Sequence, residues 1–257
     1  MSSSSSSKKI SIGGVEIDCL SFEDTVNRVI RRAQSNEKPG YVVTPNAHHI
    51  NLLQNNPRFQ NVYHNAFLVV ADGVSLLWAS KWLGKPLPGR VNGTDLFERL
   101  CAEAAERGLS VFLLGGRPGA AEQAAHQLCQ RHPTLHLSGT HCPPYGFEQD
   151  PQAIEQINQA IRRAKPDLLF VGLGAPKQEF WMAENCEQLG VPISLGIGVS
   201  FEFVAGMVKR APGLMQVTGL EWLFRLLMEP RRLWQRYLIG NLSFLGLIIR
   251  QKLALRG

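Results

Sequence analysis

The chain lacks a long hydrophobic run and is poor in cysteine. Its serine run over residues 1–7 has no apolar stretch behind it, so we expect a disordered tail over 1–9 and no signal peptide. The five cysteines are odd in number and form no CxxC pair, which favours a reducing, cytoplasmic compartment over a disulfide framework. The mostly apolar stretch from Tyr237 to Ile249 has 13 residues, too few for a bilayer span, which needs about 20.

Several motifs of known chemistry are also absent. The sequence has no P-loop, no HExxH, no GxSxG and no GxGxxG with a later acidic residue. It also lacks a DxD-like acidic pair that would chelate a divalent ion beside a nucleotide sugar, so we expect no metal and no other cofactor. A zinc site on His141 and Cys142 lacks further ligands at suitable spacing. The adjacent His48 and His49 are interpreted as packing or surface histidines.

Short apolar runs alternate with helical patterns along residues 10–206. At 257 residues, 44% of them hydrophobic, the chain is long enough to bury a sizeable core. The alternation predicts a Rossmann-like three-layer α/β domain with a mostly parallel sheet. After a hairpin at 10–20, the expected strands are 42–43, 68–71, 111–114, 135–138, 168–171 and 193–195, and the expected helices are 21–33, 47–53, 73–83, 96–107, 120–131, 152–164 and 177–189.

Residues 207–257 differ from the rest in charge. From Lys209 onward there are nine basic and two acidic residues, a net charge of +7. The whole chain has a net charge of +6, so the residues before Lys209 carry −1. This asymmetry, with aromatic residues of the kind found at membrane interfaces, predicts a basic, amphipathic helical appendage that binds an anionic membrane surface. One continuous helix would place Arg225, Arg232 and Arg236 on one side. The alternative is a core-packing helical subdomain with solvated arginines. No nucleic-acid-binding module is present, so we expect no nucleic-acid partner.

Glycine pairs follow three of the predicted strands. Gly115 and Gly116, Gly172 and Gly174, and the pair 196/198 would let the backbone approach a phosphate closely at one edge of the sheet. Each turn alone is ordinary turn chemistry. Three turns at one edge predict a site for a nucleotide diphosphate.

Asp72 stands where the predicted strand 68–71 ends. It can cap the helix that begins at Gly73, or it can act as a catalytic carboxylate, and the residues themselves leave both open.

Five motifs in chain order resemble one known family, the WecG/TagA/CpsF glycosyltransferases (glycosyltransferase family 26), over nearly the whole chain. This family includes N-acetylmannosaminyltransferases of teichoic-acid and enterobacterial-antigen synthesis. The motifs are Thr44-Pro45-Asn46, Ala71-Asp72-Gly73, the run from Arg90 to Leu96, the run from Val171 to Glu179, and Arg210-Ala211-Pro212 with Gly219-Leu220-Glu221-Trp222.

The resemblance implies an inverting transfer of a sugar from a UDP-sugar to a polyprenyl-diphosphate-linked GlcNAc at the cytoplasmic face of the plasma membrane. N-acetylmannosamine is the expected sugar, with glucose and N-acetylmannosaminuronate as alternatives. The resemblance is also compatible with a homo-oligomer. Asp72 matches the family's catalytic base, and Thr44 and Asn46 match positions beside it. Arg90 and Gln178 match substrate contacts, to which we add Lys177 beside the glycine turns. We expect the diphosphate and the membrane to meet Arg225, Arg231, Arg232 and Arg236 of the appendage. A non-catalytic nucleotide- or lipid-binding protein is the rival hypothesis.

Overall fold

The computed structural model describes residues 7–255, apart from the side chains of Val217, Arg232 and Arg236. Most of the predicted tail, residues 1–6, therefore lies outside the described residues, whereas Lys9 already belongs to the first strand. A two-stranded antiparallel hairpin opens the fold, formed by β1 (Lys9–Ile12) and β2 (Val15–Asp18).

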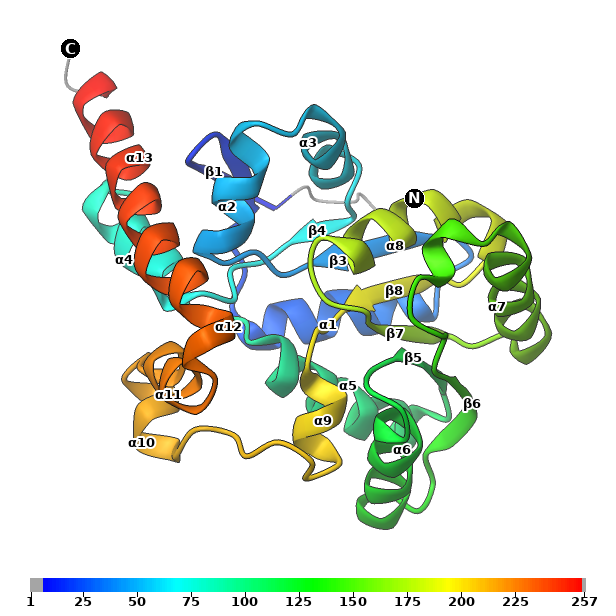
Figure 1. Ribbon diagram of the computed structural model, residues 1–257. Helices are drawn as coiled ribbons and strands as arrows, with labels where there is room; N and C mark the ends of the chain where they lie inside the picture. The colour runs from blue at the N-terminus through cyan, green and yellow to red at the C-terminus, as the bar shows by residue number, and fades with distance from the viewer. Residues whose placement is uncertain (1–6, 256–257) are drawn as a thin grey trace.

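The centre of the molecule is a six-stranded sheet in the order β4-β3-β8-β7-β5-β6 (Figure 1). Each pair of neighbouring strands runs parallel, so all six carboxyl ends meet at one edge. The strands are β3 (Gly40–Val43), β4 (Leu68–Val69), β5 (Ser110–Gly115), β6 (His136–His141), β7 (Leu168–Gly172) and β8 (Ile193–Gly196).

Helices cover both faces of this sheet. Neighbouring strand residues point to opposite faces, and both are buried: Val42 packs into one core and Val43 into the other. The Val42 face is covered by α1 (Phe22–Ala33), α5 (Gly93–Arg107), α6 (Ala120–Arg131) and α9 (Ser200–Val204). The Val43 face is covered by α2 (Ala47–Gln54), α3 (Pro57–His64), α4 (Val74–Trp82), α7 (Pro151–Ala164) and α8 (Lys177–Leu189), with the short 3-10 helix η1 (Phe147–Gln149) before α7. The predicted three-layer α/β fold is confirmed.

Local signals explain most helix boundaries. The Ser21 hydroxyl accepts the backbone N–H of Asp24 and so caps α1, and Gly108 ends α5 in the left-handed conformation that glycine adopts without strain. Helix α3 is not among the helices that the sequence predicts, because Asn55-Asn56-Pro57 is typical of a turn. The structure shows instead that Asn56 is the N-cap and Pro57 the first residue of a helix.

The appendage consists of several helices and not of one. Its elements are α10 (Gly213–Val217), α11 (Glu221–Met228), α12 (Pro230–Trp234), the π-helical turn η2 (Gln235–Ile239) and α13 (Gly240–Ala254). The chain leaves the helical conformation at Glu229, with φ −133° and ψ 58°, and a new helix starts at Pro230. Arg225 therefore lies on a different helix from Arg232 and Arg236, so the condition for placing all three on one side of a single helix is not met.

The last helix, α13, packs against the α/β domain. Phe244 and Ile248 are buried in the same core as α2 and the hairpin. The Gln251 side chain accepts the Gly13 N–H at 2.8 Å and donates to the Ser11 carbonyl at 2.9 Å. The face of α13 that carries Phe244 and Ile248 therefore packs into the core, as the core-packing alternative predicts. Many apolar side chains elsewhere on the appendage are exposed. None of the described helices is both long enough and apolar enough to span a bilayer.

Candidate active site

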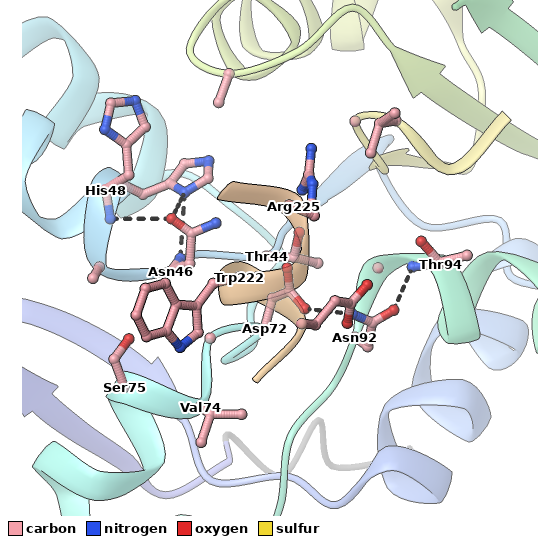
Figure 2. Close-up of a pocket in the computed structure, with 18 of the residues that line it drawn as sticks. Thr44, Asn46, His48, Asp72, Val74, Ser75, Asn92, Thr94, Trp222 and Arg225 are labelled. Carbon is pink, nitrogen blue, oxygen red and sulfur yellow. Dashed lines mark hydrogen bonds between the residues drawn. The ribbon is translucent and has the colours of Figure 1, made fainter. Parts of the chain in front are cut away.

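A cavity of about 1010 Å³ lies at the carboxyl edge of the sheet. Polar residues that directly follow β3 and β4 line one side of it, among them Thr44, Asn46 and Asp72. Glycine turns after β5, β7 and β8 line another side. The appendage forms a further wall with Glu221, Trp222 and Arg225 of α11, of which Figure 2 shows Trp222 and Arg225 beside Asp72 and Asn46.

The glycine turns lie at a topological switch point of the sheet. Strands β5 and β7 are neighbours, but the helix after β5 covers one face and the helix after β7 covers the other. In open α/β folds, ligands bind in the crevice that this reversal creates. Gly116, Gly172 and Gly174 line the cavity there, as predicted from the sequence.

Gly115 does not line the cavity but is required for packing. A Cβ built on it would lie 2.8 Å from the backbone carbonyl of Gly172, and its φ of +103° disfavours other residues. The Gly116 N–H donates to the Gly172 carbonyl at 2.8 Å. Gly115 thus allows the ends of β5 and β7 to approach closely, and it lies outside the lining of the cavity.

The Asp72 carboxylate points into the cavity and does not cap a helix. The N-cap of α4 is Gly73, which has no side-chain cap bond. Asp72 Oδ1 instead accepts a hydrogen bond from Asn92 Nδ2 at 3.0 Å (Figure 2). It also accepts one from the Arg90 guanidinium at 3.4 Å. Arg90 Nε also donates to the Asp72 backbone carbonyl at 2.5 Å. The capping alternative is wrong, and the carboxylate is held in a fixed orientation.

The surroundings of Asp72 make its carboxylate a stronger base. Burial raises the pKa of Asp72 above its ordinary value, the positive charge of Arg90 opposes this rise, and the negative charge of Glu221 adds to it. A perturbed carboxyl group in a cavity, with named charge partners, is typical of a catalytic acid or base.

A charged network joins Asp72 to the appendage. The Arg90 guanidinium contacts Glu221 Oε2 at 3.1 Å as well as Asp72. Burial alone would lower the pKa of Arg90, but the charges of Asp72 and Glu221 outweigh it and raise the pKa, so the guanidinium stays charged. Arg210 contacts Asp95 at 2.6 Å and donates to Asn92 Oδ1 at 3.2 Å. Arg210 and Glu221 both belong to the appendage. The appendage therefore helps to hold Asn92 and Arg90, the two residues that bind Asp72.

Thr44 and Asn46 lie at the start of α2, on the same side of the cavity. The Thr44 hydroxyl donates to the Gly196 carbonyl at 3.4 Å. Asn46 caps α2, accepting the His48 N–H at 3.1 Å, and its Oδ1 lies 3.0 Å from His49 Nδ1. The other ring nitrogen of His49 is 3.5 Å from Glu179 Oε1, and both side chains are buried. His49 is thus a buried histidine that supports Asn46, and both His48 and His49 also line the cavity.

The remaining predicted residues divide between the cavity and the surface. Gln178 lines the cavity and is buried, with Oε1 accepting the Gly198 N–H at 3.1 Å. Arg225 also lines it. Lys177 does not, because its ammonium group contacts Glu148 at 2.6 Å. Arg231 is exposed outside the cavity, and the side chains of Arg232 and Arg236 lie outside the described residues.

Several functional candidates escaped the interpretation of the sequence. The family motifs include Asn92, Arg210 and Glu221, but the sequence alone indicates no role for these three residues. Glu202 carried no sequence signal at all, yet it lines the cavity and is buried. Its Oε1 accepts the Arg117 N–H at 3.0 Å, and its Oε2 has no hydrogen-bond partner. Among the described residues, no group of three or more His, Cys, Asp or Glu could hold a metal ion.

Comparison with known proteins identifies the family of the chain. The model of the glycosyl transferase WecG/TagA/CpsF family matches residues 10–257. The chain belongs to this family. It is 31% identical over 232 residues to an N-acetylglucosaminyldiphosphoundecaprenol N-acetyl-beta-D-mannosaminyltransferase of Staphylococcus aureus (strain MW2), covering 89% of this chain and 88% of that protein. A protein of the same name from Bacillus spizizenii is 31% identical over 201 residues, covering 78% of this chain and 76% of its own length. The chain is accordingly a glycosyltransferase.

Proposed function

We propose that the chain transfers N-acetylmannosamine from a UDP-sugar to a GlcNAc linked through a diphosphate to a polyprenyl lipid, with inversion at the anomeric carbon. The names of the relatives support the transferred sugar and the acceptor. The observation that carries the proposal is the position of Asp72, an oriented and basic carboxylate in the cavity that also reaches the glycine turns.

The nucleotide of the donor is proposed to bind at the switch point. Gly116, Gly172 and Gly198 let the diphosphate approach the backbone closely, because no side chain intervenes. Glu202 Oε2 is a buried acceptor without a partner in the same cavity, and leaving such an atom unpaired costs free energy. A pair of ribose hydroxyl groups would satisfy it. This assignment accounts for the unpaired Oε2 of a buried carboxylate whose other oxygen accepts the Arg117 N–H.

The reaction follows from the position of the base. The acceptor hydroxyl oxygen attacks the anomeric carbon while Asp72 takes its proton, and the bond from that carbon to the β-phosphate oxygen of UDP breaks. One displacement of this kind inverts the configuration. Asn92 and Arg90 hold the carboxylate in place throughout, so that its free oxygen faces the acceptor.

Arginines are proposed to meet the charge that develops on the departing UDP. Arg225 extends from α11 into the cavity, and Arg117 lines it beside Gly116. A guanidinium bonds a phosphate through two N–H groups and stabilises negative charge in the transition state. We therefore propose that the charge of the leaving group is balanced by side chains and not by a metal ion.

The appendage is proposed to hold the enzyme at the inner face of the plasma membrane. The +7 charge of residues 209–257 favours anionic lipid by roughly 1 kcal/mol for each basic residue near the surface. Exposed apolar side chains of the appendage, among them Leu227, Met228 and Trp234, would enter the interface. Vesicle co-sedimentation, with RNA as the competing polyanion, tests this partner.

A panel of UDP-sugars with one lipid-linked GlcNAc acceptor tests the function. We expect transfer of radiolabel from UDP-N-acetylmannosamine, with product of inverted configuration. Transfer from UDP-glucose or UDP-N-acetylmannosaminuronate alone would contradict the donor assignment. Binding of UDP without transfer of any sugar would support the non-catalytic alternative instead.

A further inference from the structure

Two further helices, α4 and α13, line the active-site cavity, and we call the part of the cavity between them the groove. Its α4 side is formed by Val74, Ser75, Trp78, Ala79 and Trp82. These positions are spaced as one face of a helix, so the whole face borders the cavity.

Helix α13 forms the opposite side of this groove. Asn241, Phe244, Leu245 and Ile248 line the cavity and again share one helix face. Phe244 and Ile248 are buried because they also pack into the core, whereas Leu245 is 51% exposed. The groove therefore has a floor anchored in the fold and an open apolar rim.

Charge is separated along the cavity. The described side chains that α4 and α13 contribute include no Asp, Glu, Lys or Arg. The charged lining residues all lie on other elements, namely Asp72, Arg90, Arg117, Glu202, Glu221 and Arg225. A cavity with both a charged part and an apolar part fits an amphiphile better than it fits two polar substrates.

Two tryptophans are unusually exposed in this groove. Trp78 is 60% exposed and Trp82 47% exposed, and each lines the cavity. Large exposed apolar side chains that border a cavity mark a site for an apolar ligand. Other exposed apolar residues, such as Trp234 and Leu253, lie outside the cavity and are free to face a bilayer.

We propose that the groove between α4 and α13 binds the first isoprenoid units of the acceptor lipid. This inference rests on the proposed function. Trp78 and Trp82 cover one side of the hydrocarbon chain and Leu245 covers the other, while the diphosphate and the sugar reach the charged part. The groove thus sets the distance between the isoprenoid units and Asp72. The hydrocarbon of the acceptor, and not its sugar alone, supplies binding free energy.

The test compares two acceptors in detergent without phospholipid. One is GlcNAc diphosphate on an undecaprenyl chain, and the other carries a short, water-soluble alkyl group. In the W78A/W82A double variant we expect KM for the long-chain acceptor to rise about 10-fold, because apolar contact is lost. The KM for the short-chain acceptor, the KM for the donor and the kcat should stay within about 2-fold. The W78F/W82F variant keeps an apolar surface and should restore most of the loss.

Trp234→Ala is the matched control. Like Trp78 and Trp82, Trp234 is an exposed tryptophan, but it belongs to the appendage and does not line the cavity. It should leave both acceptor KM values unchanged. Equal effects of W78A/W82A on both acceptors would overturn the proposal. So would loss of vesicle binding with an unchanged long-chain KM, which would make these tryptophans membrane anchors.

A cross-linking experiment decides the groove independently of catalysis. A diphosphate lipid with a photoreactive diazirine on its first isoprene unit is bound to the full chain, irradiated, and the labelled peptides are mapped by mass spectrometry. We expect label within 74–82 and 240–254, and its absence from both segments would overturn the proposal. If the wild type transfers sugar to neither acceptor, the proposed function fails while this measurement still decides the groove.

Discussion

The two walls of the cavity are built in different ways. The sheet edge contributes Asp72, Thr44 and the glycine turns, each placed by the end of a buried strand. The appendage contributes Arg210 and Glu221, which reach the site through ion pairs with Asp95 and Arg90. The first wall is set by hydrogen bonds of the sheet, and the second by charges that depend on pH and salt. We therefore expect the sheet to fix the position of Asp72 and the appendage to influence how strong a base Asp72 is.

The largest effect is expected at the sheet wall. Asp72→Asn keeps the shape of the side chain but removes the base, and we expect kcat to fall by about 10³-fold. Calorimetry should show unchanged binding of UDP, because Asp72 does not hold the nucleotide. Asp24→Asn, an exposed position on α1, is the control. Turnover near the wild-type value in the Asp72 variant would remove the base assignment.

A smaller effect is expected where the appendage supports Asn92. Arg210→Gln loses the pair with Asp95 and the bond to Asn92, each a contact to a charged group. Such contacts contribute about 1.5–3 kcal/mol, so we expect kcat/KM to fall about 10- to 100-fold. The melting temperature should be measured alongside. A loss of stability with full activity per folded molecule would show that the two walls are not coupled.

The donor phosphate provides the next comparison, between two arginines of the appendage. Arg225 lines the cavity and Arg231 does not. We expect Arg225→Gln to raise the donor KM by about 10-fold, because a charged contact to phosphate is lost. Arg231→Gln should leave this KM unchanged and weaken binding to anionic vesicles only. Equal donor KM values for the two variants would place the diphosphate elsewhere.

The smallest effect is expected at Lys177, which the sequence predicted as a substrate contact. Its ammonium group pairs with Glu148 at the surface, and such pairs contribute about 0–1 kcal/mol to stability. Lys177→Gln should change the donor KM by less than about 2-fold. A large increase would show that Lys177 turns toward the donor during the reaction.

The sequence predicted the sheet wall far better than the appendage wall. Strand ends are visible as apolar runs that stop at Asp72 or at paired glycines, and parallel strands bring those ends to one edge. The pair between Arg90 and Glu221 spans 131 positions of the chain, and no local pattern signals it. Gly115 was assigned to the ligand because a turn glycine that packs and one that lines a cavity look alike in sequence. Their difference lies in the close approach of β5 to β7.

The appendage also shows why pattern alone was insufficient. Its arginines have helical spacing, but the break at Glu229 divides them between two helices. Proline is common at the first position of a helix, and α12 begins at Pro230. Phe244 packs into a core shared with α2 and the hairpin at the other end of the chain, and periodicity does not predict this contact between distant segments.

The coupling of the two walls is tested most directly by the pH dependence of kcat/KM in Glu221→Gln. Glu221 raises the pKa of Asp72, so its loss lowers that pKa, and Arg90 is left with Asp72 as its only charged carboxylate partner at Nη2. Activity needs ionised Asp72, and it falls as the pH drops through this pKa. We therefore predict that the acidic limb moves to lower pH in Glu221→Gln, with no shift in the exposed control Glu155→Gln. An acidic limb that stays in place or moves to higher pH would contradict the account.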